Sequence, residues 1–428
     1  MADEGDAPDR ILVVEDSRSV AGLIAGRIED ELALTALIAG SRAEAQRLLE
    51  AYAGQISAAI LDLDLPDAPQ GEVVDDVVAA RIPSLVLTAT LEDDRRDQLM
   101  SAGVCDYIMK DAPDAIDASL RSLKRIHRNQ WIDVLVVDDS RSARQYLVHL
   151  LARWGFRCHE ASSGEEAIRC IEAGEPSIRL LLCDQNMPGM DGITLIREVR
   201  RRYTSQRLGI IGVSSHGSGL LSARLLKAGA DDFLTRPFLE EELSVRVNQN
   251  VDLMELLREA QEGARRDALT GLHNRLYLEE LAEPLGETAR RTQQPLSALV
   301  VDLDHFKGLN DRLGHFGGDV VLKRVAGLLR ETVRRSDVLV RSGGEEFYIV
   351  SLGIDAEGAR TLAERIRCGI EALELSYEGK SVALSASIGV ANLEGAKVEQ
   401  ALKAADLAMY EAKRQGRNRV VGPLTSSD

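Results

Sequence analysis

The strongest constraint on the fold of this chain is an internal repeat. The run ILVVEDSRS near the start returns as VLVVDDSRS further along the chain. Two later segments return in the same order: LDLDLP, with Asp62, answers CDQNMP, with Asp184, and AGVCDYIMK, ending at Lys110, answers AGADDFLTR, ending at Arg236. One fold is therefore expected twice in succession.

Each repeat alternates short runs rich in Val, Ile and Leu with stretches of helical period, which predicts β-α units around a buried parallel sheet. In the first repeat the five candidate strands are Ile11 to Val14, Leu34 to Ile38, Ala58 to Leu61, Ser84 to Leu87 and Tyr107 to Met109. Five strands with helices between them indicate a flavodoxin-like, doubly wound α/β fold, in which functional residues lie at the carboxyl ends of the strands.

Polar residues stand at those strand ends in the first repeat. Glu15 and Asp16 follow one strand and Asp62 follows another, so three carboxylates are expected to converge. Such a group repels itself unless a divalent cation neutralises it, and Mg2+ is the expected ion. Thr88 and Lys110 end two further runs and would complete a pocket for a phosphoryl group on Asp62. The alternative is a solvated rim of unrelated acids.

Length and charge limit what the chain folds into and binds. Its 428 residues predict about three domains, and 52 Lys and Arg against 69 Asp and Glu give a net charge of −17. That charge repels nucleic acid and anionic lipid surfaces. No apolar run approaches the roughly 18 to 20 residues that span a bilayer, and the first ten residues are acidic. We therefore expect a cytoplasmic protein with neither nucleic-acid nor membrane partners.

A different unit follows the second repeat, from about Asp267. Its run SALVVDLDHF is an apolar strand that ends in Asp302 and Asp304, and DVLVRSGGEEFYIVS consists of two apolar segments around a Gly-Gly pair. That pair predicts a tight hairpin with Glu345 and Glu346 at its tip. If the hairpin lies beside the strand that ends at Asp302, three carboxylates meet as a ligand set for Mg2+ and a triphosphate.

Residues 240–266 join the second repeat to this unit. Their apolar side chains recur in steps of three and four, at Leu243, Val247, Val251, Met254 and Leu257. This spacing predicts one continuous helix whose apolar seam pairs with a second molecule of the chain. The alternative is an amphipathic terminal helix that packs only on the second repeat.

With these residues in view, both repeats resemble the receiver domain of two-component response regulators. In the first repeat the resemblance implies that Asp62 accepts a phosphoryl group, Glu15 and Asp16 bind Mg2+, Thr88 and Lys110 read the phosphate, and Tyr107 is the switch aromatic. In the second it implies Asp138 and Asp139 for metal, Asp184 as acceptor, Ser214 for the hydroxyl, Arg236 for the cation and Phe233 for the aromatic.

The second repeat departs from the receiver pattern at Arg236, where the family has lysine. A guanidinium is a bulkier planar fork, so the exchange is not conservative in a tight phosphate pocket. The first repeat departs at Asp111, where the family usually has proline. We expect Asp62 to be the regulated site, with Asp184 as a second acceptor. We also expect the carboxylates of Asp62 and Asp184 to bind the metal ion.

The last unit resembles the GGDEF domain of diguanylate cyclases almost end to end. The motifs that carry the resemblance are DALTGLHNR, DLDHFKGLNDRLGHFGGD, GGEEF, ASIGVA and AMYEAKRQGRNRV, in that order. The resemblance implies an α/β fold of the nucleotidyl-cyclase, palm-like type. It also implies that two facing domains condense two GTP into cyclic di-GMP and release pyrophosphate.

Site roles in this unit follow from the same resemblance. Asp302 and Glu346 would hold Mg2+, with Mn2+ as an alternative, and Glu345 would bind the metal or help to deprotonate the attacking 3′-hydroxyl. Lys307, Lys413 and Arg417 would hold the β and γ phosphates. Asn310 and Asp319 would hydrogen-bond the guanine edge. For Asn310 and Asp319 alone, helix capping and surface polarity are the alternative.

The run RRSD, just before the hairpin, resembles the inhibitory RxxD site of the same family. By that resemblance Arg334 and Asp337 bind the guanine and phosphate of the product, with Arg365 as a further ligand. Some members carry another arginine one turn before Arg365, where this chain has Thr361. The alternative is a solvated helix end at which basic residues are favoured by the dipole.

These observations predict a response-regulator diguanylate cyclase in the order receiver, receiver, GGDEF. The expected bounds are 10–128 and 132–250 for the receivers, 251–266 for a helical linker and 267–424 for the GGDEF domain. The expected partners are GTP, cyclic di-GMP as product and inhibitor, a cognate sensor histidine kinase and a second copy in a homodimer. The alternative function is an inactive GGDEF adaptor that binds cyclic di-GMP or GTP and signals through partners.

Overall fold

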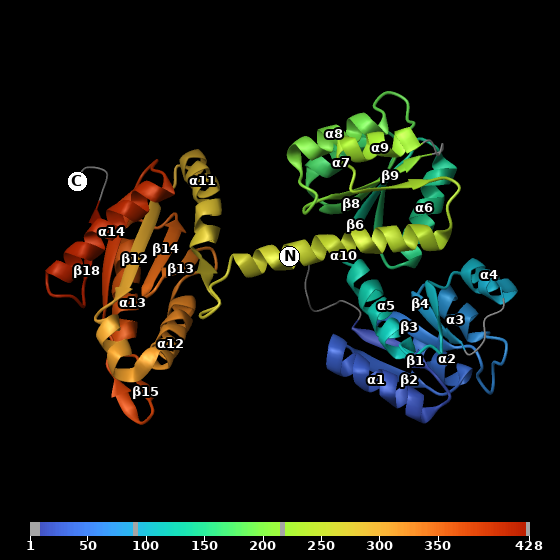
Figure 1. Cartoon of the computed structure of the whole chain (residues 1–428), viewed down its shortest axis with the longest axis horizontal. Helices are drawn as coiled ribbons and strands as arrows, with labels where there is room; N and C mark the ends of the chain where they lie inside the picture. The colour runs from blue at the N-terminus through green and yellow to red at the C-terminus, as the bar shows by residue number, and fades with distance from the viewer. Residues whose placement is uncertain (1–8, 89–92, 215–218, 425–428) are drawn as a thin grey trace. The chain divides into compact units, whose positions relative to one another are not determined.

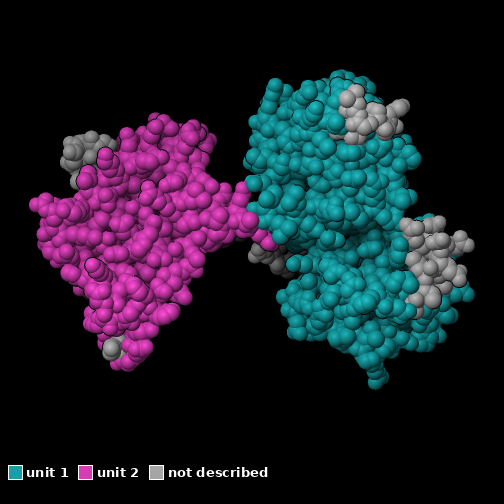
Figure 2. All heavy atoms as spheres, viewed as in Figure 1, with its two compact units in different colours: residues 1–258 teal, residues 259–428 magenta. Residues whose placement is uncertain are grey.

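The computed structural model describes residues 9–88, 93–214 and 219–424. The chain divides into two compact units, residues 1–258 and 259–428 (Figure 2). Unit 1 contains both repeats, and unit 2 contains the segment with the GGEEF hairpin. Within the described ranges, none of the helices combines the length and the apolar character needed to span a bilayer.

The first repeat is a five-stranded parallel sheet in the order β2-β1-β3-β4-β5, with helices between the strands (Figure 1). Its elements are β1 Arg10–Val14, α1 Arg18–Leu32, β2 Thr35–Ala39, α2 Arg42–Ala51, β3 Ile56–Asp62, α3 Val73–Ala79, β4 Ser84–Thr88, α4 Asp93–Ala102, β5 Asp106–Met109 and α5 Ala115–Asn129. The five strands expected from the sequence are confirmed to within about two residues at each end.

The second repeat has the same topology, because its order read from the other edge is β7-β6-β8-β9-β10. Its elements are β6 Asp133–Val137, α6 Arg141–Arg153, β7 Arg157–Ala161, α7 Gly164–Ala173, β8 Ile178–Asp184, α8 Gly192–Arg202, β9 Gly209–Ser214, α9 Gly219–Ala228, β10 Asp232–Thr235 and α10 Glu240–Ala264. The predicted tandem of doubly wound, flavodoxin-like sheets is confirmed.

Alternation along the strands explains why helices cover both faces of each sheet. In β1, Ile11 and Val13 face one hydrophobic cluster and Leu12 and Val14 face another. The cluster of Ile11 and Val13 continues through α5 into the second repeat, where it includes Val134. The two repeats of unit 1 therefore share part of one core.

Helix α10 is continuous, as expected, but most of its predicted apolar seam packs on its own repeat and not on a second molecule. Leu243, Val247, Val251 and Met254 are all buried, and the first three belong to the core that contains strands of the second repeat. These four side chains are therefore not available to a second molecule, and the interpretation of them as a pairing seam is wrong. Leu257, the fifth residue of the predicted seam, is exposed. The alternative of an amphipathic helix packed on its own repeat accounts for the four buried side chains.

Unit 2 contains a six-stranded mixed sheet in the order β11-β13-β14-β12-β17-β18, and a two-stranded sheet of β15 and β16. Its elements are β11 His273–Asn274, α11 Arg275–Thr292, β12 Leu296–Leu303, α12 Phe306–Thr332, β13 Val338–Gly343, β14 Glu346–Leu352, α13 Ala356–Glu371, β15 Leu375–Tyr377, β16 Lys380–Val382, β17 Ala386–Leu393, α14 Val398–Arg414 and β18 Val420–Leu424. The α/β class predicted for this unit is confirmed.

The centre of this sheet is strand β12, which is buried at every position and pairs antiparallel with both β14 and β17. Helix α14 packs over β17 so closely that a Cβ on Gly389 would lie 1.9 Å from the carbonyl oxygen of Ala405. Only glycine therefore permits this approach. The close packing fixes α14, and with it Lys413 near its end, against β17 and β12.

Candidate functional site

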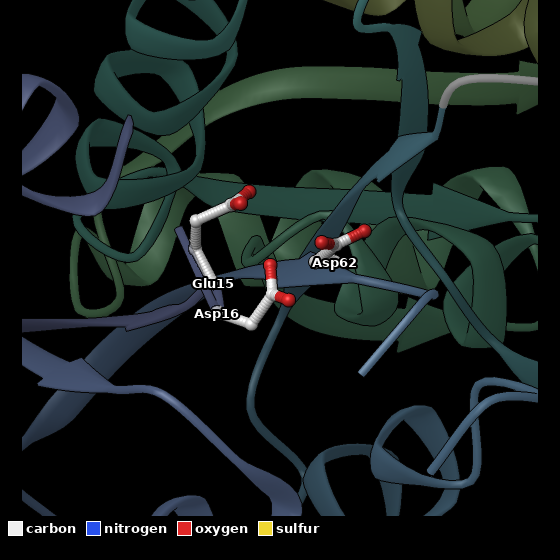
Figure 3. Close-up of side chains that lie close together, drawn as sticks. All are labelled: Glu15, Asp16 and Asp62. Atoms are coloured by element: carbon white, nitrogen blue, oxygen red, sulfur yellow. The ribbon is translucent and has the colours of Figure 1, made fainter. Parts of the chain in front are cut away.

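Three acids of the first repeat meet at the carboxyl edge of its sheet. Glu15 and Asp16 follow β1 and Asp62 ends β3, and one oxygen from each carboxylate lies within 4.8 Å of the other two (Figure 3). Glu15 and Asp62 are buried, whereas Asp16 is exposed. Carboxylate oxygens are the type of ligand that Mg2+ prefers, and these three are close enough to suit one ion.

Lys110 is the cation of this pocket. Its Nζ lies 2.9 Å from Glu15 Oε2 and 2.7 Å from Asp62 Oδ2. Burial raises the pKa of Glu15, and the negative charge of Asp62 adds to this rise, while the hydrogen bond from Lys110 opposes it. Burial lowers the pKa of Lys110, but the hydrogen bonds to Asp62 and Glu15 outweigh it and raise the pKa above its usual value. Thr88 is buried at the end of β4, as the sequence leads one to expect.

The second repeat holds its acids differently. Nη2 of Arg236 lies 2.7 Å from Asp138 Oδ2 and Nη1 lies 2.9 Å from Asp184 Oδ1, so the guanidinium bridges two buried carboxylates. Asp139 is exposed, and in the part of the chain that the structure describes these acids form no cluster as close as the first. Burial raises the pKa of Asp184, despite the backbone hydrogen bond from Asn186.

The remaining receiver residues lie where the repeat predicts them. Ser214 is buried at the end of β9, in the position that Thr88 has on β4. The two aromatic residues, Tyr107 on β5 and Phe233 on β10, are both half-buried. The guanidinium of Arg246 lies 5.8 Å from the centre of the Phe233 ring.

In unit 2 the strand register brings together two of the acids expected to bind Mg2+. Strands β12 and β14 pair so that Asp302 stands opposite Glu346, and Gly343 pairs with Glu346 across the turn. Glu345 thus lies in the turn itself, where its carbonyl oxygen accepts the backbone N–H of Leu303 at 3.4 Å. The sequence expectation of a hairpin beside the strand of Asp302 is confirmed.

The most buried of these acids is paired with a cation. Burial raises the pKa of Asp302, with Lys413 opposing it, and burial together with the charge of Asp302 raises the pKa of Glu346. The Nζ of Lys413 lies 2.7 Å from Asp302 Oδ2, so the one ammonium neutralises the most buried of these acids. Carboxylates whose protonation is favoured by mutual repulsion are a suitable donor set for Mg2+.

The other cations expected around a triphosphate, Lys307 and Arg417, are exposed. Lys307 lies in the first turn of α12, and Arg417 lies in the loop between α14 and β18 with a φ of 64°. No ion pair is recorded for either side chain among the described residues. Both therefore remain accessible to an anionic ligand.

Asn310 carries an unexplained polar atom. Its Oδ1 is buried and has no hydrogen-bond partner among the described residues. A Cβ on Gly318 would lie 1.9 Å from that oxygen, so a larger residue at position 318 would displace the Asn310 side chain. An unpaired buried acceptor costs about 1–3 kcal/mol, which a ligand with a donor edge would recover. Asp319, the other residue expected to contact guanine, is half-buried in the part of α12 that follows the kink at Gly314.

Two residues that hold the hairpin, Arg341 and Asp267, were not predicted from the sequence. Arg341 donates from Nε and Nη2 to the carbonyl oxygen of Gly344, at 3.0 and 2.7 Å. Its Nη1 contacts both carboxylate oxygens of Asp267, at 2.9 and 3.1 Å. Asp267 opens a motif visible in the sequence, DALTGLHNR, but nothing there points to its partner 74 positions away.

The predicted product-binding residues line one pocket of about 440 Å3. Arg334, Asp337 and Arg365 all line it, together with Thr361. The backbone N–H of Arg334 donates to Asp337 Oδ2 at 2.9 Å, and Nη2 of Arg365 donates to the carbonyl oxygen of Thr332 at 2.6 Å. The two arginines thus lie at the same cavity, Arg334 in the loop between α12 and β13 and Arg365 on α13.

Comparison with known proteins agrees with this architecture. Residues 264–419 match the family model described as diguanylate cyclase, GGDEF domain, and residues 134–248 match the response regulator receiver domain. Response regulator PleD from Caulobacter vibrioides is 28% identical over a 465-residue alignment that covers 96% of this chain and 99% of PleD. Diguanylate cyclase DosC from Escherichia coli is 41% identical over 175 residues, 39% of this chain and 38% of DosC.

A solved structure supports the same conclusion. The crystal structure of a two-component system response regulator/GGDEF domain protein is 39% identical, with a TM-score of 0.53, and the match covers 58% of this chain and 99% of that one. Fold and sites together define a regulator in which receiver modules precede a nucleotidyl-cyclase domain. The chain belongs to the response-regulator diguanylate cyclases, and its last unit is their GGDEF domain.

Proposed function

We propose that this chain, as a homodimer, condenses two GTP into cyclic di-GMP with release of two pyrophosphates. The observation that carries the proposal is the register of β12 and β14, which sets Asp302 opposite Glu346 with the Lys413 ammonium 2.7 Å from Asp302. A buried acid, two half-buried acids of the adjacent hairpin and a cation suit phosphoryl chemistry, which depends mainly on positioning and charge stabilisation.

In this proposal Asp302, Glu345 and Glu346 hold Mg2+, or Mn2+ in its place. The bound ion would withdraw charge from the α-phosphate oxygens. Glu345 takes the proton of the 3′-hydroxyl while that oxygen bonds to the α-phosphorus of the second GTP and the bond to pyrophosphate breaks.

The remaining roles concern binding. Lys307, Lys413 and Arg417 hold the β and γ phosphates, and Lys413 already lies at the acid cluster. Asn310 and Asp319 bind the guanine edge, which supplies the donors that the buried Asn310 oxygen lacks. An adenine edge cannot match this pair, so GTP is the preferred substrate.

A homodimer is required because each domain binds one GTP and the product joins two. Support for pairing comes from three exposed leucines of α10, of which only Leu257 belongs to the predicted seam. Leu253, Leu256 and Leu257 are exposed, with Leu253 and Leu256 at 55% and 63%, although large apolar side chains are usually covered. A second α10 that covers these leucines would raise the effective concentration of one GGDEF domain near the other.

Regulation is proposed at two places. A cognate sensor histidine kinase phosphorylates Asp62, and Asp184 is the second candidate acceptor. Cyclic di-GMP inhibits by binding at the pocket of Arg334, Asp337 and Arg365, a cavity of about 440 Å3. An Arg334→Ala variant should therefore keep turnover at low product concentration but lose inhibition, measured as initial rate against added cyclic di-GMP. Unchanged inhibition would assign the product to another site.

The direct test is incubation of the purified chain with GTP and Mg2+, with and without an acyl-phosphate donor, followed by chromatography of the products. Cyclic di-GMP should appear in at least one condition. Glu346→Ala should lower the rate by at least about a hundredfold, because it removes a metal-binding carboxylate. Glu374→Ala, at an exposed acid of the same unit, is the matched control and should leave the rate unchanged.

The alternative, an inactive adaptor, predicts nucleotide binding without product in every condition. Against it stand the acids Asp302, Glu345 and Glu346 and the glycines Gly343 and Gly344, all present and arranged as a hairpin. GTP binding by calorimetry together with absence of product would favour the adaptor. Product formation rejects it.

A further inference from the structure

The loop that carries Arg417 is held in an unusual backbone conformation. It joins α14, which ends at Arg414, to β18, which begins at Val420. Arg417 and Asn418 have φ values of 64° and 44°, in the left-handed region that residues with a Cβ seldom adopt. Two such residues in succession persist only where the surroundings impose the conformation.

One constraint comes from the catalytic strand. Asp304, two positions after Asp302, accepts the backbone N–H of Asn418 at 3.1 Å. The same carboxylate accepts the hydroxyls of Ser385 and Ser387, at 2.8 and 2.7 Å, at the start of β17. Asp304 is therefore fully engaged as an acceptor, and it connects the loop backbone to the strand that bears the metal-binding acid.

The second constraint comes from α13. The Asn418 side chain donates from Nδ2 to Glu371 Oε1 at 2.7 Å, and its Oδ1 accepts from Arg367 Nη1 at 2.9 Å. Arg367 is itself fixed by Glu364 and Glu371, at 2.9 and 2.8 Å. Both ends of the Asn418 amide are thus used by two side chains of one helix.

We propose that Asn418 is a positioning residue, which fixes the loop so that the exposed Arg417 guanidinium meets the β and γ phosphates of GTP. Asp304 acts on the same loop through its backbone. The proposal rests on the proposed function and extends it, because it assigns part of triphosphate recognition to side chains that touch no substrate. An arginine fixed before binding loses less freedom when it engages phosphate.

The contacts alone also fit a loop that merely ends a helix. A positioning role and a purely structural role predict different effects on nucleotides with different numbers of phosphates. If Asn418 acts through Arg417, its loss weakens binding of a triphosphate and leaves a monophosphate unaffected. If it only stabilises the fold, GTP and GMP weaken together.

The experiment measures equilibrium binding of a non-hydrolysable GTP analogue and of GMP to the full chain with Mg2+, by calorimetry. Asn418→Ala should weaken binding of the analogue about tenfold, as expected for one charge-assisted contact, with GMP unchanged. In an Arg417→Ala background the same substitution should have no further effect, because the residue it positions is absent. In turnover, KM for GTP should rise more than kcat falls.

The matched control is Arg360→Ala. Arg360 Nη1 donates to the carbonyl oxygen of Gly422 at 2.9 Å and so joins α13 to β18 without contact with the loop. It should leave the binding of both ligands unchanged. If Arg360→Ala reproduces the loss, or if Asn418→Ala weakens GMP as much as the analogue, the positioning role is rejected.

A second variant guards against misfolding. Glu371→Gln removes one charged partner of Asn418 on the exposed side of α13 and should weaken the analogue selectively, by less than Asn418→Ala does. Full additivity of Glu371→Gln with Arg417→Ala would also reject the proposal. Binding data separate failure of the positioning role from failure of the proposed function. A wild-type chain that binds GTP but makes no product contradicts the proposed function, and the positioning test on binding remains valid.

Discussion

At the carboxyl edge of the first sheet, one ammonium nitrogen of Lys110 contacts both Glu15 and Asp62, at 2.9 and 2.7 Å. At the same edge of the second sheet, the guanidinium of Arg236 gives a separate nitrogen to each of two aspartates. The sheets have identical strand orders. The difference therefore lies in side chains, Lys110 against Arg236 and Glu15 against Asp138, and not in the fold.

We infer from this difference that the type of cation determines whether the acidic pocket can accept a phosphoryl group. A lysine is a point charge on a flexible stem, which can turn from a carboxylate to an incoming phosphoryl oxygen. A guanidinium fork already satisfies both Asp138 and Asp184 and occupies the space between them. We infer that the first pocket accepts phosphate readily and that the second is closed by its own arginine.

The largest expected effect separates the two acceptors. Asp62→Asn should abolish the change in cyclase rate produced by an acyl-phosphate donor, because no acyl phosphate forms on an amide. Asp184→Asn should change that response little. The measurement is cyclic di-GMP formation with and without the donor, in parallel for wild type and both variants. A response that survives Asp62→Asn but not Asp184→Asn would reverse the comparison.

A second prediction transfers the arginine to the first pocket. Lys110→Arg should reduce the response to the phosphodonor by about tenfold, because a fork that bridges Glu15 and Asp62 excludes the phosphoryl group. The basal rate should stay near that of wild type. Lys124→Arg, at an exposed lysine of α5, is the control. A full response in Lys110→Arg would show that the shape of the cation does not matter.

Much of this architecture was predictable from the sequence because it depends on local pattern. The repeat, the apolar strands and the acids at strand ends appear as short strings, so both sheets and the cluster of Glu15, Asp16 and Asp62 were expected. The surface that covers the apolar face of α10 was not predictable in this way. Spacing of three and four identifies an apolar stripe such as Leu243 and Val247, but not whether its own domain or a second molecule covers it.

The interactions that hold the catalytic unit together were beyond sequence reasoning for a different reason. Arg341 reaches Asp267 across 74 positions and Asn418 reaches Asp304 across 114. Such pairs arise only when strands distant in sequence are aligned, and no local period marks them. Arg236 is an intermediate case, because its identity was visible but its bridge between Asp138 and Asp184 required the fold.

The smallest expected effect is a gain of function in the second pocket. In an Asp62→Asn background, Arg236→Lys should raise labelling of the chain by a radioactive acyl-phosphate donor several-fold, since the exchange releases Asp138 and Asp184 from the fork. The gain should depend on Mg2+ and disappear on further substitution of Asp184 by Asn. Asp139 remains exposed and outside any close cluster, so labelling should stay below that of wild type. If Asp62→Asn alone is labelled as fully as wild type, Arg236 does not close the second pocket, and the difference between the repeats must be sought outside the cation.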